Sequence, residues 1–132
     1  MFVDASAIVA IMMTEPEAAG LILKLNSAES PITSPVAVYE SVMAICRHRA
    51  ISVSQGERDV RQFLALSGVV IAPIGDAEVV TALDAAARYG KGRGHPAQLN
   101  MGDCFTYAMA RNHGRALLFT GDDFRRTDLR LA

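Results

Sequence analysis

Residues 1–12 read MFVDASAIVAIM, and this opening stretch decides the fold class. Phe2 and Val3 are apolar, Asp4 carries a charge, and a long apolar run follows at once. Burying a charge inside such a run is costly unless other groups compensate it. The pattern therefore predicts a short buried strand that ends at Asp4, a helix over Ala5–Met13, and partners for Asp4 supplied by the rest of the chain.

Short apolar strands and helices alternate along the whole chain. Two capping-box spacings, from Thr14 to Glu17 and from Ser54 to Glu57, predict helices that run to about Ala28 and to near Gly68. Further helices are expected over residues 36–50, 76–89 and 102–112, and short strands within residues 30–35, 69–71, 116–120 and 129–131. Wholly apolar strands between helices are typical of a parallel sheet covered on both faces. We therefore predict one α/β domain over residues 1–132.

The composition fits one domain inside the cell. A chain of 132 residues is near the usual size of a domain, and 51% of its residues are hydrophobic. No apolar stretch approaches the ~20 residues that span a bilayer, and no cationic leader precedes the first apolar run. Two cysteines are too few for a disulfide framework. These features predict a cytoplasmic protein with no membrane segment.

Charge is distributed unevenly, although the net charge is only −1. Residues 1–87 contain five Lys or Arg against ten Asp or Glu, whereas residues 88–132 contain eight against four. Eleven of the 13 basic residues are arginines, which suit bidentate phosphate binding better than lysines do. A GC-rich genome would give the same excess of arginine, so only the asymmetry between the two parts carries weight.

Four acidic residues fall where a site is expected. In open parallel sheets, binding sites form beyond the carboxyl ends of the strands. Asp4 and Asp122 follow predicted strands at this edge, and Asp103 begins a helix after a glycine-rich loop. Glu40 lies in mid-helix, on an otherwise largely apolar stripe that includes Arg47. Each acid also has an ordinary interpretation, because the three aspartates could cap helices and Glu40 could pair with Arg47.

Taken together, the four acids predict a site for a divalent cation. They would repel one another at one edge of the sheet unless a cation neutralised them. Donor sets made only of oxygen favour hard ions such as Mg²⁺ or Mn²⁺. One or two such ions can activate a bound water for attack on a phosphodiester, without a Ser or Cys nucleophile.

With these residues in place, the chain resembles the PIN-domain ribonucleases, specifically the VapC-like toxins of type II toxin–antitoxin systems. The resemblance covers nearly the whole chain and rests on VDASA at 3–7, Glu40, LNMGDC at 99–104 and FTGDDF at 119–124. It implies a three-layer α/β/α fold with a central, mostly parallel sheet of four to five short strands. It also implies Mg²⁺- or Mn²⁺-dependent endonucleolytic cleavage of RNA, with tRNA or rRNA as the substrate.

The resemblance further implies roles and partners. The residues that match the family's catalytic acids are Asp4, Glu40, Asp103 and Asp122. Asp4 and Asp103 would hold the metal, with the other two acids acting directly or through water. Ser6, Thr120 and Asp123 match supporting positions, and Asp123 could exchange roles with its neighbour Asp122. The implied partners are the RNA substrate, a VapB-like antitoxin that inserts into the active-site groove, and a second copy in a homodimer or a higher toxin–antitoxin assembly.

Basic residues near these acids are candidates for phosphate contacts. Arg47 shares the helix face of Glu40, and Lys91 and Arg93 lie in the loop that leads toward Asp103. RNA would need cations beside an otherwise anionic pocket. The alternative is that all three are ordinary solvated surface charges.

Three other functions remain open from the sequence. The chain could be a PIN-fold module that binds an antitoxin or RNA and represses transcription within that complex. It could be a phosphatase similar to the haloacid dehalogenases, but that family needs a second aspartate where Ser6 stands and a later lysine near the site. A receiver domain also clusters acids at the ends of strands, but it has no place for Glu40.

Overall fold

The central sheet has four strands in the order β3-β2-β1-β4, and every neighbouring pair is parallel. These strands belong to a computed structural model that describes residues 1–132. Their bounds are β1 (Phe2–Val3), β2 (Ile32–Thr33), β3 (Val70–Ile71) and β4 (Leu117–Leu118). The expected last strand is reduced to one parallel bridge between Leu131 and Leu117. The predicted parallel sheet is therefore confirmed, with β1 in its interior.

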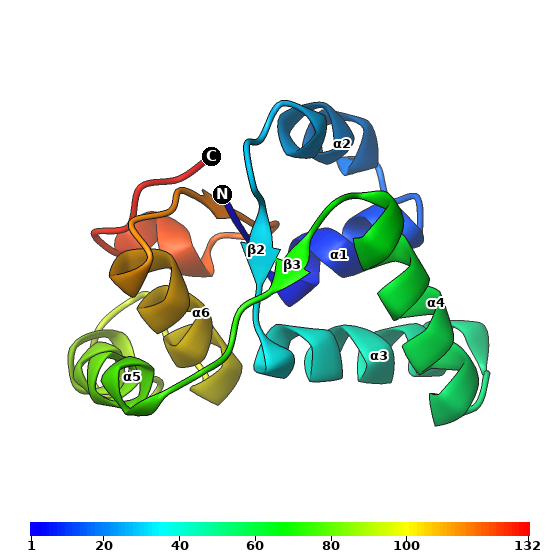
Figure 1. Cartoon of the computed structure of the whole chain (residues 1–132). Helices are drawn as coiled ribbons and strands as arrows, with labels where there is room; N and C mark the ends of the chain where they lie inside the picture. The colour runs from blue at the N-terminus through cyan, green and yellow to red at the C-terminus, as the bar shows by residue number, and fades with distance from the viewer.

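Helices cover both faces of the sheet, α1 to α4 on one side and α5 and α6 on the other (Figure 1). The helices are α1 (Ala5–Met12), α2 (Ala18–Asn26), α3 (Pro35–Arg49), α4 (Val53–Leu66), α5 (Asp76–Tyr89), α6 (Met101–Asn112) and the short 3₁₀ helix η1 (Asp123–Arg126). This arrangement confirms the three-layer α/β/α prediction. None of these helices is both long enough and apolar enough to cross a membrane.

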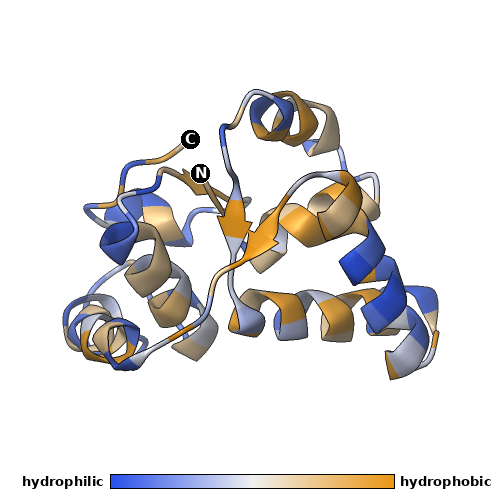
Figure 2. Cartoon of the chain, in the orientation of Figure 1, coloured by the Kyte–Doolittle hydropathy of each residue, from blue (hydrophilic) through white to orange (hydrophobic).

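Strands β1 and β4 each contribute to two hydrophobic cores because neighbouring side chains on a strand point to opposite faces. Phe2 and Leu117 belong to the core under α5 and α6, whereas Val3 and Leu118 belong to the core under α1, α3 and α4. All four side chains are essentially inaccessible to solvent. Figure 2 shows the consequence, with apolar strands at the centre and a hydrophilic outer side on α4. Burial on both faces is why β1 and β4 are wholly apolar.

Two predicted helix starts are wrong. Thr14 does not cap α2, because it adopts a left-handed conformation (φ 55°) in the turn that closes α1, where the Glu15 amide donates to the Ala10 carbonyl over 2.9 Å. α2 begins only at Ala18 and ends at Asn26. α4 is capped by Ser52, whose hydroxyl oxygen accepts from the Gln55 amide over 3.1 Å, and not by Ser54. At α4 a serine two residues earlier in the chain supplies the cap, whereas α2 begins without a side-chain cap because Thr14 is used in the turn after α1.

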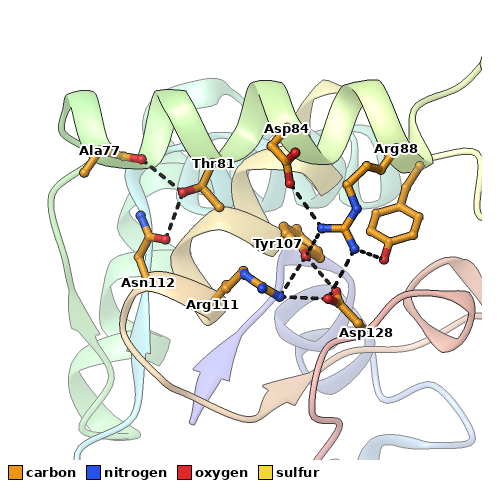
Figure 3. A network of polar contacts seen from close by, with 9 residues as sticks. Ala77, Thr81, Asp84, Arg88, Tyr107, Arg111, Asn112 and Asp128 are labelled. Atoms are coloured by element: carbon orange, nitrogen blue, oxygen red, sulfur yellow. Dashed lines mark hydrogen bonds and ion pairs between the residues drawn. The ribbon is translucent and has the colours of Figure 1, made fainter.

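A polar network ties the end of the chain to α5 and α6 (Figure 3). The Asp128 carboxylate accepts from the Tyr107 hydroxyl over 2.6 Å, from Arg111 over 2.9 Å and from Arg88 over 3.3 Å. The hydrogen bond from Tyr107, followed by those from the two arginines, lowers the pKa of Asp128 to about 2. The network thereby anchors the segment that follows η1.

Candidate active site

Asp4 lies at the carboxyl end of β1 and is 5% exposed. Its amide continues the sheet ladder by donating to the Leu118 carbonyl over 3.0 Å, and its carboxylate caps α1. The Oδ2 atom accepts from the Ser6 amide over 2.9 Å and from the Ser6 hydroxyl over 2.6 Å. The Oδ1 atom accepts from the Thr106 hydroxyl over 2.7 Å. A buried carboxylate is therefore held by donors from two separate helices.

Ser6 and Thr120 lie beside Asp4, as the supporting role predicts. The Ser6 hydroxyl donates to Asp4 and accepts from the Thr120 amide over 3.1 Å. Thr120 follows β4 closely, so this bond joins the start of α1 to the end of β4. The contribution of Thr120 to this chain of bonds comes from its backbone amide.

Asp103 is positioned by a capping box at the start of α6. The Asn100 side chain accepts from the Asp103 amide over 2.9 Å, and the Asp103 Oδ2 atom accepts from the Asn100 amide over 2.9 Å. Asp103 thus occupies the third position of the helix rather than the N-cap that its ordinary interpretation required. One of its carboxylate oxygens remains without a hydrogen bond from the protein.

Glu40 comes to the site from the middle of α3. Its half-buried carboxylate forms no ion pair with Arg47 and no other hydrogen bond within the protein, so the ordinary pairing is absent. It packs instead against Gly102 in the first turn of α6, where a side chain would overlap it. The absence of a Cβ atom at Gly102 is what lets α6 approach α3 so closely.

Burial and neighbouring acids raise the pKa values of Glu40 and Asp103. Burial, and then the charges of Asp4 and Asp103, raise the pKa of Glu40 to about 7. Burial is also the largest cause for Asp103, whose pKa rises to about 6 although the Asn100 amide opposes the shift and the charges of Asp4 and Asp123 add to it. These three acids therefore share one region of negative potential.

The two adjacent acids after β4 point to different places. The Asp122 side chain is 88% exposed, pairs with Arg125 over 3.2 Å, and lines a cleft of about 580 Å³ next to α2 to which Thr120 also contributes. Asp123, at the start of η1, is the one whose charge acts on Asp103. The charges of Asp4 and Asp123 thus act on Asp103, and Asp122 is the partner of Arg125.

A cleft of about 600 Å³ lies beside Glu40, and Ser6, Arg47 and Thr120 also line it. Arg47 therefore lies where the sequence places it. Lys91 and Arg93 line a neighbouring, mostly apolar cleft of about 370 Å³ between α5 and α6. The two clefts meet at Asn100, which lines both. None of the three basic residues forms an ion pair.

Three contributors to the site were not predicted from the sequence. Asn100 stands three residues before Asp103, which is the spacing of a capping box and could have been found from that spacing. Thr106 stands three residues after Asp103, a spacing that places both on one helix face. Gly102 gave no signal, because only the structure shows which side chain packs against it.

Residues 1–129 match the model of the family described as "PIN domain". That range contains every strand, every helix and every acid of the site. The chain belongs to the PIN-domain family.

Relatives of this PIN domain carry the name VapC. VapC ribonuclease R02377 of Rhizobium meliloti is 41% identical over 140 residues, which cover 97% of this chain and 98% of that protein. Ribonuclease VapC42 of Mycobacterium tuberculosis is 39% identical over 133 residues, which cover 100% of this chain and 98% of that protein. The predicted membership among VapC-like PIN domains is thereby confirmed.

Two solved structures share the fold. The crystal structure of Mycobacterium tuberculosis VapC20, described as a sarcin-ricin loop cleaving toxin, has a TM-score of 0.77 at 13% identity and covers 99% of this chain and 97% of its own. A toxin–antitoxin complex from Klebsiella pneumoniae has a TM-score of 0.72 at 16% identity, covering 99% and 95%. At such identities the likeness concerns the fold alone.

The donor set of this PIN domain fits a hard divalent cation. All the acids of the site offer oxygen, and two of them have raised pKa values because of burial and their neighbours' charges, which a cation would relieve. No three His, Cys, Asp or Glu side chains lie close enough together to hold an ion directly. One or two direct carboxylates with water in the remaining positions is the arrangement that Mg²⁺ prefers.

Proposed function

We propose that this PIN domain is an endoribonuclease that hydrolyses phosphodiester bonds with the help of Mg²⁺ or Mn²⁺. The observation that carries the proposal is the meeting of Asp4, Glu40 and Asp103, from three separate elements, at the carboxyl edge of the sheet. The relatives named VapC ribonuclease support the same reaction. The site contains no arrangement of Ser, Cys and His that would replace the acids as a nucleophile.

In this proposal each acid has a separate task. A bound Mg²⁺ or Mn²⁺ supplies a water of lowered pKa and charge stabilisation for the phosphate oxygens. Asp4 and Asp103 would hold the ion, since hydrogen bonds fix the Asp4 carboxylate and the capping bond of Asp103 leaves one of its oxygens free. Glu40, which lines the cleft and forms no hydrogen bond within the protein, would act on the ion directly or through a water. Asp123 fits the fourth acidic position better than Asp122, because its charge acts on Asp103 whereas Asp122 pairs with Arg125.

Arg47 is the basic residue best placed to contact the RNA. It lines the same cleft as Glu40 and forms no ion pair, so its charge is available to a phosphate. Lys91 and Arg93 are weaker candidates, because they line the cleft between α5 and α6 that the homodimer proposed below would cover. Structured RNA with exposed single-stranded loops, such as tRNA or rRNA, is the substrate class we propose.

The biological role we propose is that of a cytoplasmic toxin that a VapB-like antitoxin neutralises. Solved structures of the same fold include a toxin–antitoxin complex, which supports an antitoxin as partner. We also propose a homodimer. Val79, Leu83 and Met101 support it, because these apolar side chains are 38%, 66% and 71% exposed around one cleft between α5 and α6.

Sequencing of RNA 5′ ends after induction of the protein tests the function and identifies the substrate together. We expect new 5′ ends at a few positions in structured RNA, and their loss in the Asp4→Asn variant. Asp84→Asn is the matched control, because Asp84 is an exposed acid of α5 that pairs with Arg88 far from the cleft. Equal numbers of new ends with wild type and Asp4→Asn would refute the assignment.

The alternative of a non-catalytic binding module makes a different prediction. A module that only grips an antitoxin or RNA has no need of a divalent ion at its acids. Titration of Mn²⁺ into the purified protein therefore separates the two functions, since site-dependent binding that Asp4→Asn removes favours the nuclease.

A further inference from the structure

Thr106 is a buried hydroxyl residue of α6 that lies next to the proposed catalytic acids. It is 2% exposed, and its hydroxyl donates to the Asp4 Oδ1 atom over 2.7 Å. A threonine hydroxyl at position 106 is not needed for α6 to form, because threonine is a weaker helix former than alanine. The role of the hydroxyl therefore lies in its hydrogen bond to Asp4.

The geometry of Asp4 depends on two kinds of donor. Ser6 is local, two residues away, and holds Oδ2 with both its amide and its hydroxyl. Thr106 is 102 residues away and holds Oδ1 alone. A carboxylate rotates about its Cβ–Cγ bond unless both oxygens are held, so Thr106 supplies the bond that fixes the plane of the group.

The same bond connects Asp4 to the helix that carries a second acid of the site. Thr106 and Asp103 are three residues apart on α6 and so share one face of that helix. A carboxylate accepts about four hydrogen bonds or metal contacts, and three positions on Asp4 are taken by protein donors. What remains is one free position on Oδ1, set at a fixed place relative to α6.

We propose that Thr106 is a positioning residue that holds the Asp4 carboxylate in register with Asp103 and thereby sets the affinity of the acids for a divalent cation. This inference rests on the proposed function, because it assumes that the acids bind such an ion. Groups that orient metal ligands through hydrogen bonds commonly contribute about 10- to 100-fold to metal affinity.

The test is the affinity of the purified full chain for Mn²⁺, measured by electron paramagnetic resonance without any RNA. Thr106→Val keeps the shape of the side chain and removes the donor, and we expect it to weaken Mn²⁺ binding by at least about 10-fold. Thr106→Ser keeps the donor and should remain close to wild type. An unchanged affinity in Thr106→Val, or an equal loss in both variants, would overturn the inference.

Two further comparisons make the result unambiguous. If Thr106→Val does not fold, Thr106→Ala is compared with Thr106→Ser, since these two differ only by the hydroxyl oxygen, and equal Mn²⁺ affinities would overturn the inference. The proposed function has its own separate test in Asp4→Asn. If RNA cleavage requires Asp4 but the Thr106→Val variant binds Mn²⁺ as tightly as wild type, the proposed function stands and the inference about Thr106 fails.

Discussion

Replacing Gly102 by alanine should separate the stability of this PIN domain from its activity. A Cβ atom at this position would overlap the Glu40 Oε1 atom and would lie 2.6 Å from Cδ and 2.9 Å from Oε2. All three atoms belong to the end of a flexible side chain, so the carboxylate moves and the backbone of α6 stays in place. Alanine in a helix is also favoured over glycine by roughly 0.5–1 kcal/mol.

The expected result follows from these two effects. The free energy of unfolding of Gly102→Ala should stay within about 1 kcal/mol of wild type, because the helix gains what the displaced side chain loses. Burial is the main cause of the raised pKa of Glu40, so a carboxylate pushed toward solvent should titrate well below 7. RNA cleavage should fall by about 100-fold, the usual effect of moving a reacting group by roughly 1 Å.

The assays are urea denaturation, carboxyl-carbon NMR titration of Glu40 and cleavage of RNA. Gly20→Ala is the control, because Gly20 also lies in a helix and a Cβ atom there would meet nothing within 4 Å. That variant should gain stability and cleave RNA normally. If Gly102→Ala loses several kcal/mol of stability, or if it leaves the pKa of Glu40 at about 7, the close packing of Glu40 on Gly102 is not what positions the acid.

Three other predictions concern the charged groups. The pKa of Glu40 is about 7 in the folded protein instead of 4.5, so the free energy of unfolding should fall as pH rises between these two values. Glu40→Gln should therefore be more stable than wild type at pH 8, by on the order of 2 kcal/mol, but not at pH 4. The contribution of Asp128 to stability has the opposite pH dependence. Its lowered pKa of about 2 stabilises the fold above about pH 4, and this contribution is lost toward pH 2. Asp128→Asn should cost about 1 kcal/mol at pH 7 after allowance for a side chain 41% exposed, and urea melts at both pH values would show whether the difference closes in acid. Asp123→Asn should lower the pKa of Asp103 in an NMR titration, whereas Asp122→Asn should not. If only Asp122→Asn lowered it, Asp122 would be the fourth acid of the site.

Much of the fold could be predicted because strong patterns agreed with one another. The apolar pair Phe2–Val3 and the acid after it predicted a central strand with Asp4 at its carboxyl end, and both are observed. The helix over Asp76–Tyr89 has the predicted bounds, since its apolar repeat is bordered by glycines on both sides. The predicted start of α2 was wrong because Thr14 could either cap α2 or close α1. It closes α1, which requires its left-handed conformation.

The site was predicted less completely than the fold. Three of the acids could be predicted from their positions, because an acid at a strand end, at a helix start or on an apolar helix stripe is unusual. They are Asp4, Asp103 and Glu40. The choice between Asp122 and Asp123 depends on the direction of two adjacent side chains in a turn, which a sequence does not determine. Thr106 and Gly102 act only through what they touch across α6, so their parts in the site required three-dimensional contacts.

Cleavage of a labelled structured RNA by the purified protein is the most direct test of the proposed nuclease. We expect cleavage with Mg²⁺ or Mn²⁺, loss of cleavage in EDTA, and recovery when excess ion is added. Asp4→Asn should fold with a similar melting temperature and cleave at least about 100-fold more slowly. Cleavage by Asp4→Asn at the wild-type rate, or wild-type cleavage that EDTA does not affect, would show that these acids do not form the active site.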